Sequence, residues 1–313
     1  MLNRRQIRAK VMQSIYAMHQ SGSDNLDSQQ KFLLNSIENS LDLLLLILSI
    51  FPELQKKEID FIEKSKKKHL ATKQELNPNL RFASNAIFSF FSENEQLNAA
   101  LEKHKITNWK NNDDTILNLL QDIKQSKQYD DYMALPTTNF EIDKNFAIQI
   151  FEQIIATSAA LYNYLEDNKL TWIDDIPVVN TLILKQLNQI SNLNYLFRVP
   201  TTYKDQDDQD FAIALFRKTI LNEASLAKEF SDKTPNWDID RIAEVDTIIL
   251  KMAICELLHF PSIPSKVTIN EYLELAKEYS TPKSSLFING ILDNLVKQYL
   301  DTSKGTKVGR GLL

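Results

Sequence analysis

Glycine is nearly absent from this chain of 313 residues. The five glycines are Gly22, Gly290, Gly305, Gly309 and Gly311, and none lies between residues 23 and 289. This gap excludes sites built on glycine-rich turns, such as the Walker phosphate loop, the dinucleotide fingerprint and the nucleophile elbow. It also argues against β-hairpins, whose tight turns need residues at positive φ. We therefore expect an all-α fold.

Residues that carry chemistry are also scarce. A single cysteine, Cys255, excludes a disulfide framework and indicates a reducing, cytoplasmic compartment. Cys255 follows Ile254 in an apolar helix, so we expect a packed thiol and not a reactive one. The four histidines lie far apart without metal-ligand spacing. The sequence thus predicts a protein that is not an enzyme and holds neither cofactor nor metal.

No apolar run is long enough to cross a membrane. The longest, LDLLLLILSIF at residues 41–51, is interrupted by Asp42 and falls well short of the ~20 residues that a span needs. The N-terminus has basic residues but lacks the apolar core of a secretory signal. We expect a buried core helix at 41–51 and no membrane contact.

Positive charge is local, because the net charge of the chain is −5. Residues 1–20 carry Arg4, Arg5, Arg8 and Lys10 and no acidic residue. Residues 56–73 carry seven lysines, and a basic tail begins at Lys304. A solvated helix face is the simplest interpretation of the lysine-rich stretch, with phosphate contact as the alternative. Any nucleic-acid site must therefore be confined to such patches.

The middle of the chain has helical spacing of apolar residues and repeats itself. The Phe-Ala pairs at 82, 146 and 211 are 64 and 65 residues apart. Tryptophans and prolines recur in the same register, at Trp109, Trp172 and Trp237 and at Pro136, Pro200 and Pro264. We interpret each copy as a helix, a tryptophan-bearing turn and a second helix, which must stack on neighbours to cover its apolar face. The sequence predicts that pairs 82–127, 146–190 and 211–258 superpose.

The N-terminal segment 3–20 predicts an amphipathic helix with an unusual first turn. Asn3 and Gln6 have the spacing of a capping box. Ile7, Val11, Ile15 and Met18 form a narrow core stripe, and Arg5, Arg8, Tyr16 and His19 share the adjoining face, which we expect to point outward. Arginines in a first turn oppose the helix dipole at a cost of ~0.3–1 kcal/mol each, which bound phosphates would remove.

Three segments together resemble one known family. The opening has Arg4, Arg5, Arg8 and Tyr16 in the spacing Arg-Arg-x-x-Arg…Tyr. The closing segment, 264–295, reads Ile-Asn-Glu-x-x-x-Leu-Ala-Lys from Ile269 and Phe-Ile-Asn-Gly-Ile-Leu-Asp from Phe287. Between them lies Trp237-Asp238-Ile239-Asp240-Arg241-Ile242, followed by Asp246 and Glu256-Leu257. This combination resembles the NusB family of transcription antitermination factors. We expect another helix to approach closely at Gly290, because a glycine inside a helix otherwise costs ~1 kcal/mol.

The resemblance implies an all-helical protein of two small bundles without catalytic activity. It implies binding of single-stranded, boxA-like RNA of ribosomal-RNA transcripts, together with a NusE-type small-subunit ribosomal protein, in the transcription elongation complex. By motif position, RNA contact falls to Arg4, Arg5, Arg8 and Tyr16, with Lys283 as a substitute contact in the loop before Phe287. Contact with the protein partner falls to Asp246, Lys251 and Glu256.

The chain is longer than the resemblance explains. We expect an arginine-rich helix at 1–20, a helical expansion with repeat copies at 21–204, a NusB-like domain at 205–300 and a basic tail at 301–313. The alternative function is an α-helical repeat scaffold that binds proteins only, which would have no need of an acid-free arginine helix. A fused RNA methyltransferase is excluded, since the glycine-rich cofactor loop is missing.

Overall fold

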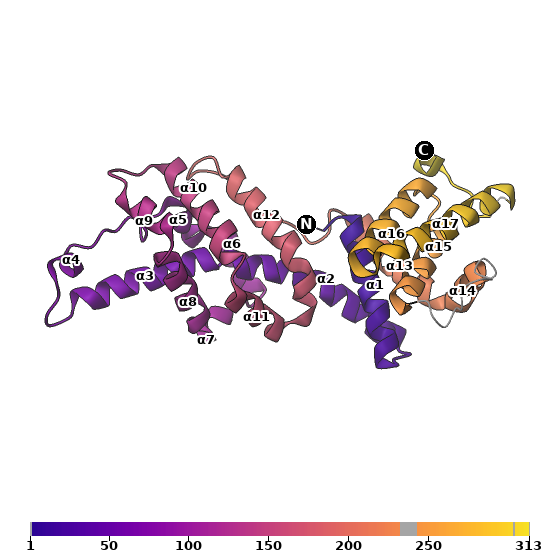
Figure 1. Cartoon of the computed structure of the whole chain (residues 1–313), viewed down its shortest axis with the longest axis horizontal. Helices are drawn as coiled ribbons and strands as arrows, with labels where there is room; N and C mark the ends of the chain where they lie inside the picture. Colours follow the sequence, from indigo (N-terminus) through magenta and orange to yellow (C-terminus); the bar gives the residue numbers. More distant parts are fainter. Residues whose placement is uncertain (1, 232–242, 303, 313) are drawn as a thin grey trace. The chain divides into compact units, whose positions relative to one another are not determined.

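The structure is a computed structural model that describes residues 2–231, 243–302 and 304–312. Its described residues form helices and contain no β-strand, so the all-α prediction is confirmed (Figure 1). Trp237 and the surrounding motif at 237–242 lie outside the described residues. The chain divides into two compact units, the first formed by 1–37 with 201–313 and the second by 38–200.

Unit 1 is a bundle built around α15. Its helices are α1 (Arg4–Ser21), the first half of α2 (Leu26–Leu48), α13 (Gln206–Leu221), α14 (Glu223–Ser231), α15 (Glu244–His259), α16 (Ser265–Tyr279) and α17 (Pro282–Thr302), with a final 3-10 turn at Gly309–Leu312. Helix α15 contacts α1, α13, α14, α16 and α17. Nearly all its side chains from Ile248 to Leu257 are buried for this reason. Cys255 is among them, so the expected packed thiol is confirmed.

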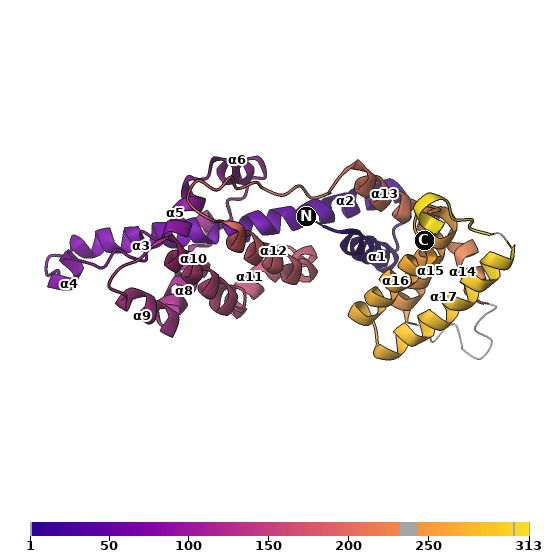
Figure 2. The same ribbon diagram turned by 90° about the horizontal axis from the view of Figure 1, so that it is seen from above.

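Unit 2 is a second helical body. It contains the rest of α2, then α3 (Ile50–Lys66), α4 (Lys73–Leu76), α5 (Ala86–Glu93), α6 (Glu95–Lys103), α7 (Asn108–Asn111), α8 (Asp113–Lys124), α9 (Lys127–Ala134), α10 (Phe140–Ile150), a π-helical turn (Phe151–Ile155), α11 (Ala159–Asn168), a 3-10 turn (Leu170–Asp175) and α12 (Ile176–Gln189). The leucines at 43–46 are fully buried, as expected of a core helix at 41–51. Figure 2 shows the same helices from above.

Among the described residues, one helical stretch has the length and composition of a membrane span, namely Leu26–Lys66. The most apolar window of this stretch is 72% buried inside the structure. Burial to this extent is that of a core helix.

The division of the chain differs from the expected boundaries at 20 and 204. Leu33 and Ile37, in the first half of α2, belong to the core of unit 1, so that unit keeps the chain up to residue 37. The basic tail also belongs to unit 1. There the Val308 amide donates to the carbonyl of Pro261, and Lys307 Nζ donates to the carbonyl of Phe260.

The repeated segments have one more break than the sequence suggests. The first helix of each copy is divided at positions 64 residues apart, Asn94, Ser158 and Asn222. The side chains of Asn94 and Ser158 cap α6 and α11 by accepting from the amides of Leu97 and Leu161. The break at each of these positions is not expected from the spacing of the apolar residues. The superposition of the three helix pairs stays a prediction.

Gly290 corrects another expectation. A Cβ atom built on this glycine of α17 would meet no heavy atom within 4 Å, and the residue is exposed. No neighbouring helix of the described chain approaches it closely. The glycine is therefore not explained by packing within this protein.

Candidate nucleic-acid interface

Helix α1 begins as the sequence predicts. The Asn3 side chain accepts from the Gln6 amide at 3.1 Å, and the Gln6 side chain accepts from the Asn3 amide at 2.7 Å. This reciprocal capping box fixes the start of the helix at Arg4. The predicted core stripe of Ile7, Val11, Ile15 and Met18 is buried against unit 1. The first turn contains no acidic residue. Its arginines are held in place because the apolar stripe packs the helix against unit 1.

The first turn of α1 borders a cleft of unit 1, which we call the arginine cleft. Its volume is about 990 Å³. Its lining comes from the start of α1, the start of α13, the turn before α16, α16 itself and the C-terminal tail: Asn3, Arg4, Arg5, Arg8, Asp207, Ser262, Ile263, Pro264, Val267, Glu271, Val308 and Gly309. A cleft bounded by arginines and open to solvent can take an anionic ligand.

Arg4 and Arg5 have donors to spare in this cleft. Arg4 Nε donates to Asp208 at 2.9 Å, and its guanidinium lies 5.0 Å from the ring centre of Phe211. Arg5 donates through Nε and Nη2 to the two oxygens of Glu271, at 3.0 and 2.9 Å. Both arginine side chains are more than 40% exposed, whereas Asp208 is 8% and Glu271 20% exposed, so the guanidinium side of each pair faces solvent. Among the described residues, both Nη groups of Arg4 and Nη1 of Arg5 have no hydrogen-bond partner.

Arg8 does not point outward as expected. Its side chain is 2% exposed, and it donates through Nε and Nη2 to the two oxygens of Glu256, both at 2.8 Å. Thr268 and Tyr272 also donate to this carboxylate, at 2.8 and 3.1 Å. Burial lowers the pKa of Arg8, but the hydrogen bonds and charge of Glu256 outweigh it and hold that pKa above its ordinary value. Arg8 is thus a charged core residue, which removes it from the RNA-contact set.

The expectation for the partner surface needs the same correction. Glu256 is fully buried, and Asp246 is 5% exposed. Lys251 is largely covered and donates to Glu223 at 2.6 Å. The reason is the central position of α15, which is covered by five other helices and leaves little free surface to bind a partner. Near this region Glu244 is exposed and Glu223 is half-buried, and their carboxylates lie 3.1 Å from the two ring nitrogens of His19.

Tyr16 and Lys283 are exposed but lie outside the arginine cleft. Tyr16 is 40% exposed, and Lys283 is an exposed second residue of α17. Arg5 pairs with Glu271 while Gln13 donates to Tyr279 at 3.4 Å, so α1 and α16 run side by side in the same direction. The end of α16 lies about 12 Å along the helix from Glu271. Lys283 follows it at the start of α17, where the sequence predicts a loop. The predicted RNA residues therefore lie along one edge of unit 1.

The sequence gives little indication of the anionic partners of the arginines. Asp208 lies in an acidic stretch typical of a solvated surface, and Glu271 belongs to the closing motif without a sign of its role. The burial of Glu256 could have been predicted from the sequence, because it is an acidic residue in a stretch from Ile248 to Leu258 that is otherwise apolar except for Lys251. A carboxylate in such a helix needs a buried cation.

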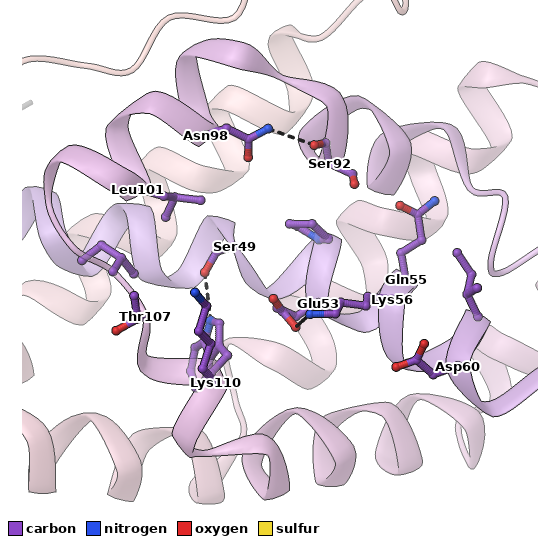
Figure 3. Close-up of a pocket in the computed structure, with 14 residues that line it drawn as sticks. Ser49, Glu53, Gln55, Lys56, Asp60, Ser92, Asn98, Leu101, Thr107 and Lys110 are labelled. Carbon is purple, nitrogen blue, oxygen red and sulfur yellow. Dashed lines mark hydrogen bonds and ion pairs between the residues drawn. The ribbon is translucent and has the colours of Figure 1, made fainter. Parts of the chain in front are cut away.

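A second cavity lies within unit 2 and is shown in Figure 3. Its volume is about 360 Å³, and α3, α6 and α7 line it. Its polar groups mostly bond one another: Asn98 donates to the carbonyl of Ser92 at 3.0 Å, and Trp109 Nε1 donates to Ser49 Oγ at 2.8 Å. None of the predicted site residues lines it, and we assign it no ligand.

Comparison with known proteins identifies the family. A sequence profile of the NusB family matches residues 181–297. A Salinibacter ruber protein named transcription antitermination protein NusB is 40% identical over 121 residues, which are 39% of this chain and 75% of that protein. Proteins of the same name from Clostridium kluyveri and Chloroherpeton thalassium are 44% and 37% identical over 29% and 34% of this chain. The chain covers only 58% and 50% of those two relatives.

No solved structure matches the chain. The match to the Salinibacter ruber protein extends over three quarters of that relative, and the family profile covers α13 to α16 and most of α17 of unit 1. These helices include Glu256 and Glu271, the residues that hold Arg8 and Arg5. The chain therefore belongs to the NusB family.

Proposed function

We propose that this protein is an RNA-binding transcription antitermination factor of the cytoplasm. It binds single-stranded, boxA-like RNA of ribosomal-RNA transcripts along the α1–α16 edge of unit 1. The supporting observation is the first turn of α1, where Arg4 and Arg5 are exposed at a cleft and keep unpaired guanidinium nitrogens. The relatives named above carry the name of an antitermination protein. The function is one of binding and includes no catalytic step.

The proposed contacts divide by chemistry. Arg4 and Arg5 use their exposed and unpaired guanidinium nitrogens to bind RNA phosphates, and a planar guanidinium binds phosphate through two parallel hydrogen bonds. Tyr16 offers an exposed ring on which an unstacked base can lie. Lys283 supplies a further charge at the far end of the edge.

The proposed protein partner is a NusE-type small-subunit ribosomal protein, which joins this factor to the elongation complex. Asp246 and Lys251 are too covered to form the contact alone. We propose that their neighbours, the exposed Glu244 and the half-buried Glu223, take part in the contact.

A binding measurement tests the function. The purified chain is titrated into fluorescently labelled boxA-like RNA and into a scrambled RNA of equal length, with and without the NusE-type protein. We expect tighter binding of the boxA-like RNA, and a further gain when the partner is present. Equal binding of both RNAs would contradict recognition of boxA-like RNA, and binding of neither RNA, with the partner complex intact, would favour the scaffold that binds proteins only.

A further inference from the structure

A region of positive charge lies in an otherwise acidic unit. Residues 38–200 contain 17 lysines and arginines against 22 acidic residues. Within them, residues 56–73 contain seven lysines against Glu58, Asp60 and Glu63. Glu58 is buried and pairs with Lys124, so it does not offset the surface charge. We call residues 56–73, together with α4, the lysine tip.

The lysine tip is exposed by the way α3 packs. The C-terminal half of α3 and α4 extend beyond the other helices of unit 2 in both views (Figures 1 and 2). The buried face of α3 includes Phe51, Leu54 and Ile62. Lys56, Lys64 and Lys67 project within about 80° of one another on the opposite side. The apolar face of α3 is thus used by the core of its own unit, and the lysines face solvent.

Most charges of the lysine tip are not neutralised within the chain. Lys64, Lys66 and Lys67 are exposed and have no carboxylate within 4.0 Å among the described residues. Lys56, Lys57 and Lys68 are the exceptions, since they pair with Glu53 at 3.8 Å, Asp113 at 2.5 Å and Glu75 at 2.6 Å. The tip therefore presents free ammonium groups for an anionic ligand.

Helix stability does not account for so many lysines. One or two cations near the C-terminus of a helix gain roughly 0.3–1 kcal/mol each from its dipole. Lys64 lies three and four positions from Lys67 and Lys68, and like charges at these spacings repel. A ligand with regularly spaced negative charges would remove this repulsion.

We propose that the lysine tip binds the phosphates of single-stranded RNA, as a second and sequence-independent contact. The inference rests on the proposed function, which supplies the RNA. Phe61 supports RNA as the ligand, because its ring is 56% exposed beside Lys124, whose Nζ lies 4.5 Å from the ring centre. Exposed rings among lysines suit single strands, where bases stack and phosphates pair with cations. An anionic membrane would need a continuous apolar helix face to insert. The large apolar side chains that α3 exposes are Ile59 and Phe61, and two side chains do not make such a face, since Phe51, Leu54 and Ile62 are buried.

Two triple variants of the full chain form the test. The tip variant is Lys64→Gln, Lys66→Gln, Lys67→Gln. The control variant, Lys103→Gln, Lys127→Gln, Lys185→Gln, removes three exposed lysines without carboxylate partners elsewhere in unit 2, so both have the same net charge. Affinity for a long scrambled single-stranded RNA is measured from roughly 50 to 200 mM salt. Thermal unfolding shows that both variants fold.

We expect the tip variant to bind the scrambled RNA roughly 10- to 50-fold more weakly at physiological salt, with a salt slope smaller by up to roughly 2. The control should bind like the parent, and a tip variant with arginine at the three positions should retain binding. Equal weakening in tip and control variants would overturn the proposal. Unchanged RNA binding by the tip variant would also overturn it. If vesicles of phosphatidylserine bind the parent chain but not the tip variant, the ligand of the tip is a membrane and not RNA. If the parent chain binds scrambled and boxA-like RNA equally, the proposed recognition of boxA-like RNA is refuted. The comparison of tip and control variants on scrambled RNA still tests the lysine tip in that case.

Discussion

At the residue scale, the arginines of α1 have two separate roles. Arg8 forms a fully enclosed ion pair with Glu256, while Arg4 and Arg5 form exposed pairs at the cleft. Breaking a buried pair leaves an uncompensated charge in the core, whereas exposed pairs contribute little. Substitutions in one turn of one helix should therefore separate stability from RNA binding.

We expect Arg8→Met to destabilise unit 1 by about 3–5 kcal/mol, because Glu256 loses its buried cation. The matched change Arg5→Met should cost less than about 1 kcal/mol, since Arg5 is 44% exposed. Hydrogen exchange of the α15 amides reports both changes locally. Equal protection in the two variants would contradict the structural role of Arg8.

Cys255 provides a pH-dependent test of the same core. Burial raises the pKa of its thiol to about 11. The folded state therefore binds the thiol proton more tightly than the unfolded state does. This difference contributes to the free energy of unfolding below the ordinary thiol pKa, and the contribution is lost as pH rises toward 11. At pH values near the ordinary thiol pKa, we expect a disulfide reagent to label Cys255 only after denaturation. Rapid labelling of the native protein would show that the α15 core is open.

At the scale of single helices, Gly290 is the residue without a structural reason. It lies in α17 with open space where a side chain would be. Gly290→Ala should raise the free energy of unfolding by up to about 1 kcal/mol, because alanine is the better helix former. Calorimetric melting measures this change. If the variant is less stable, the described packing around α17 is wrong. If it is more stable and binds RNA more weakly, the glycine makes room for the ligand.

Helix-scale features are predictable where a local pattern determines them. The capping box of Asn3 and Gln6, the stripe from Ile7 to Met18 and the buried run at 41–51 all follow from spacing along one helix. The burial of Arg8 does not, because a helical wheel gives the direction of a side chain but not how many neighbours cover it. Met12 is buried beside Arg8, so the covered face of α1 is wider than the stripe. The placement of Glu256 depends in the same way on the central position of α15.

At the scale of the whole molecule, charge is distributed unevenly between the units. Unit 1 has 19 basic and 19 acidic residues, and unit 2 has five more acidic than basic residues. Neither unit carries a net positive charge, so the proposed RNA contacts are local patches, namely the first turn of α1 and the lysine tip. Since each unit has its own core, changes at one site should leave the folding of the other unit intact.

The central claim is that exposed arginines of α1 bind RNA phosphates, and the double variant Arg4→Ala, Arg5→Ala tests it most directly. Arg8 is kept, so the buried pair with Glu256 is preserved, and thermal unfolding checks that the variant without the Arg4–Asp208 pair is folded. The control Arg217→Ala, Lys297→Ala removes two exposed charges elsewhere in unit 1, including an arginine paired with Asp27 at 2.8 Å.

The measurement is the affinity of both variants for boxA-like RNA as a function of salt. We predict weaker binding by the α1 variant, with a salt slope smaller by roughly 0.7 for each RNA phosphate that the variant no longer binds, and unchanged binding by the control. If the α1 variant binds with the affinity and salt slope of the parent, the arginine cleft is not the RNA site and the account is contradicted.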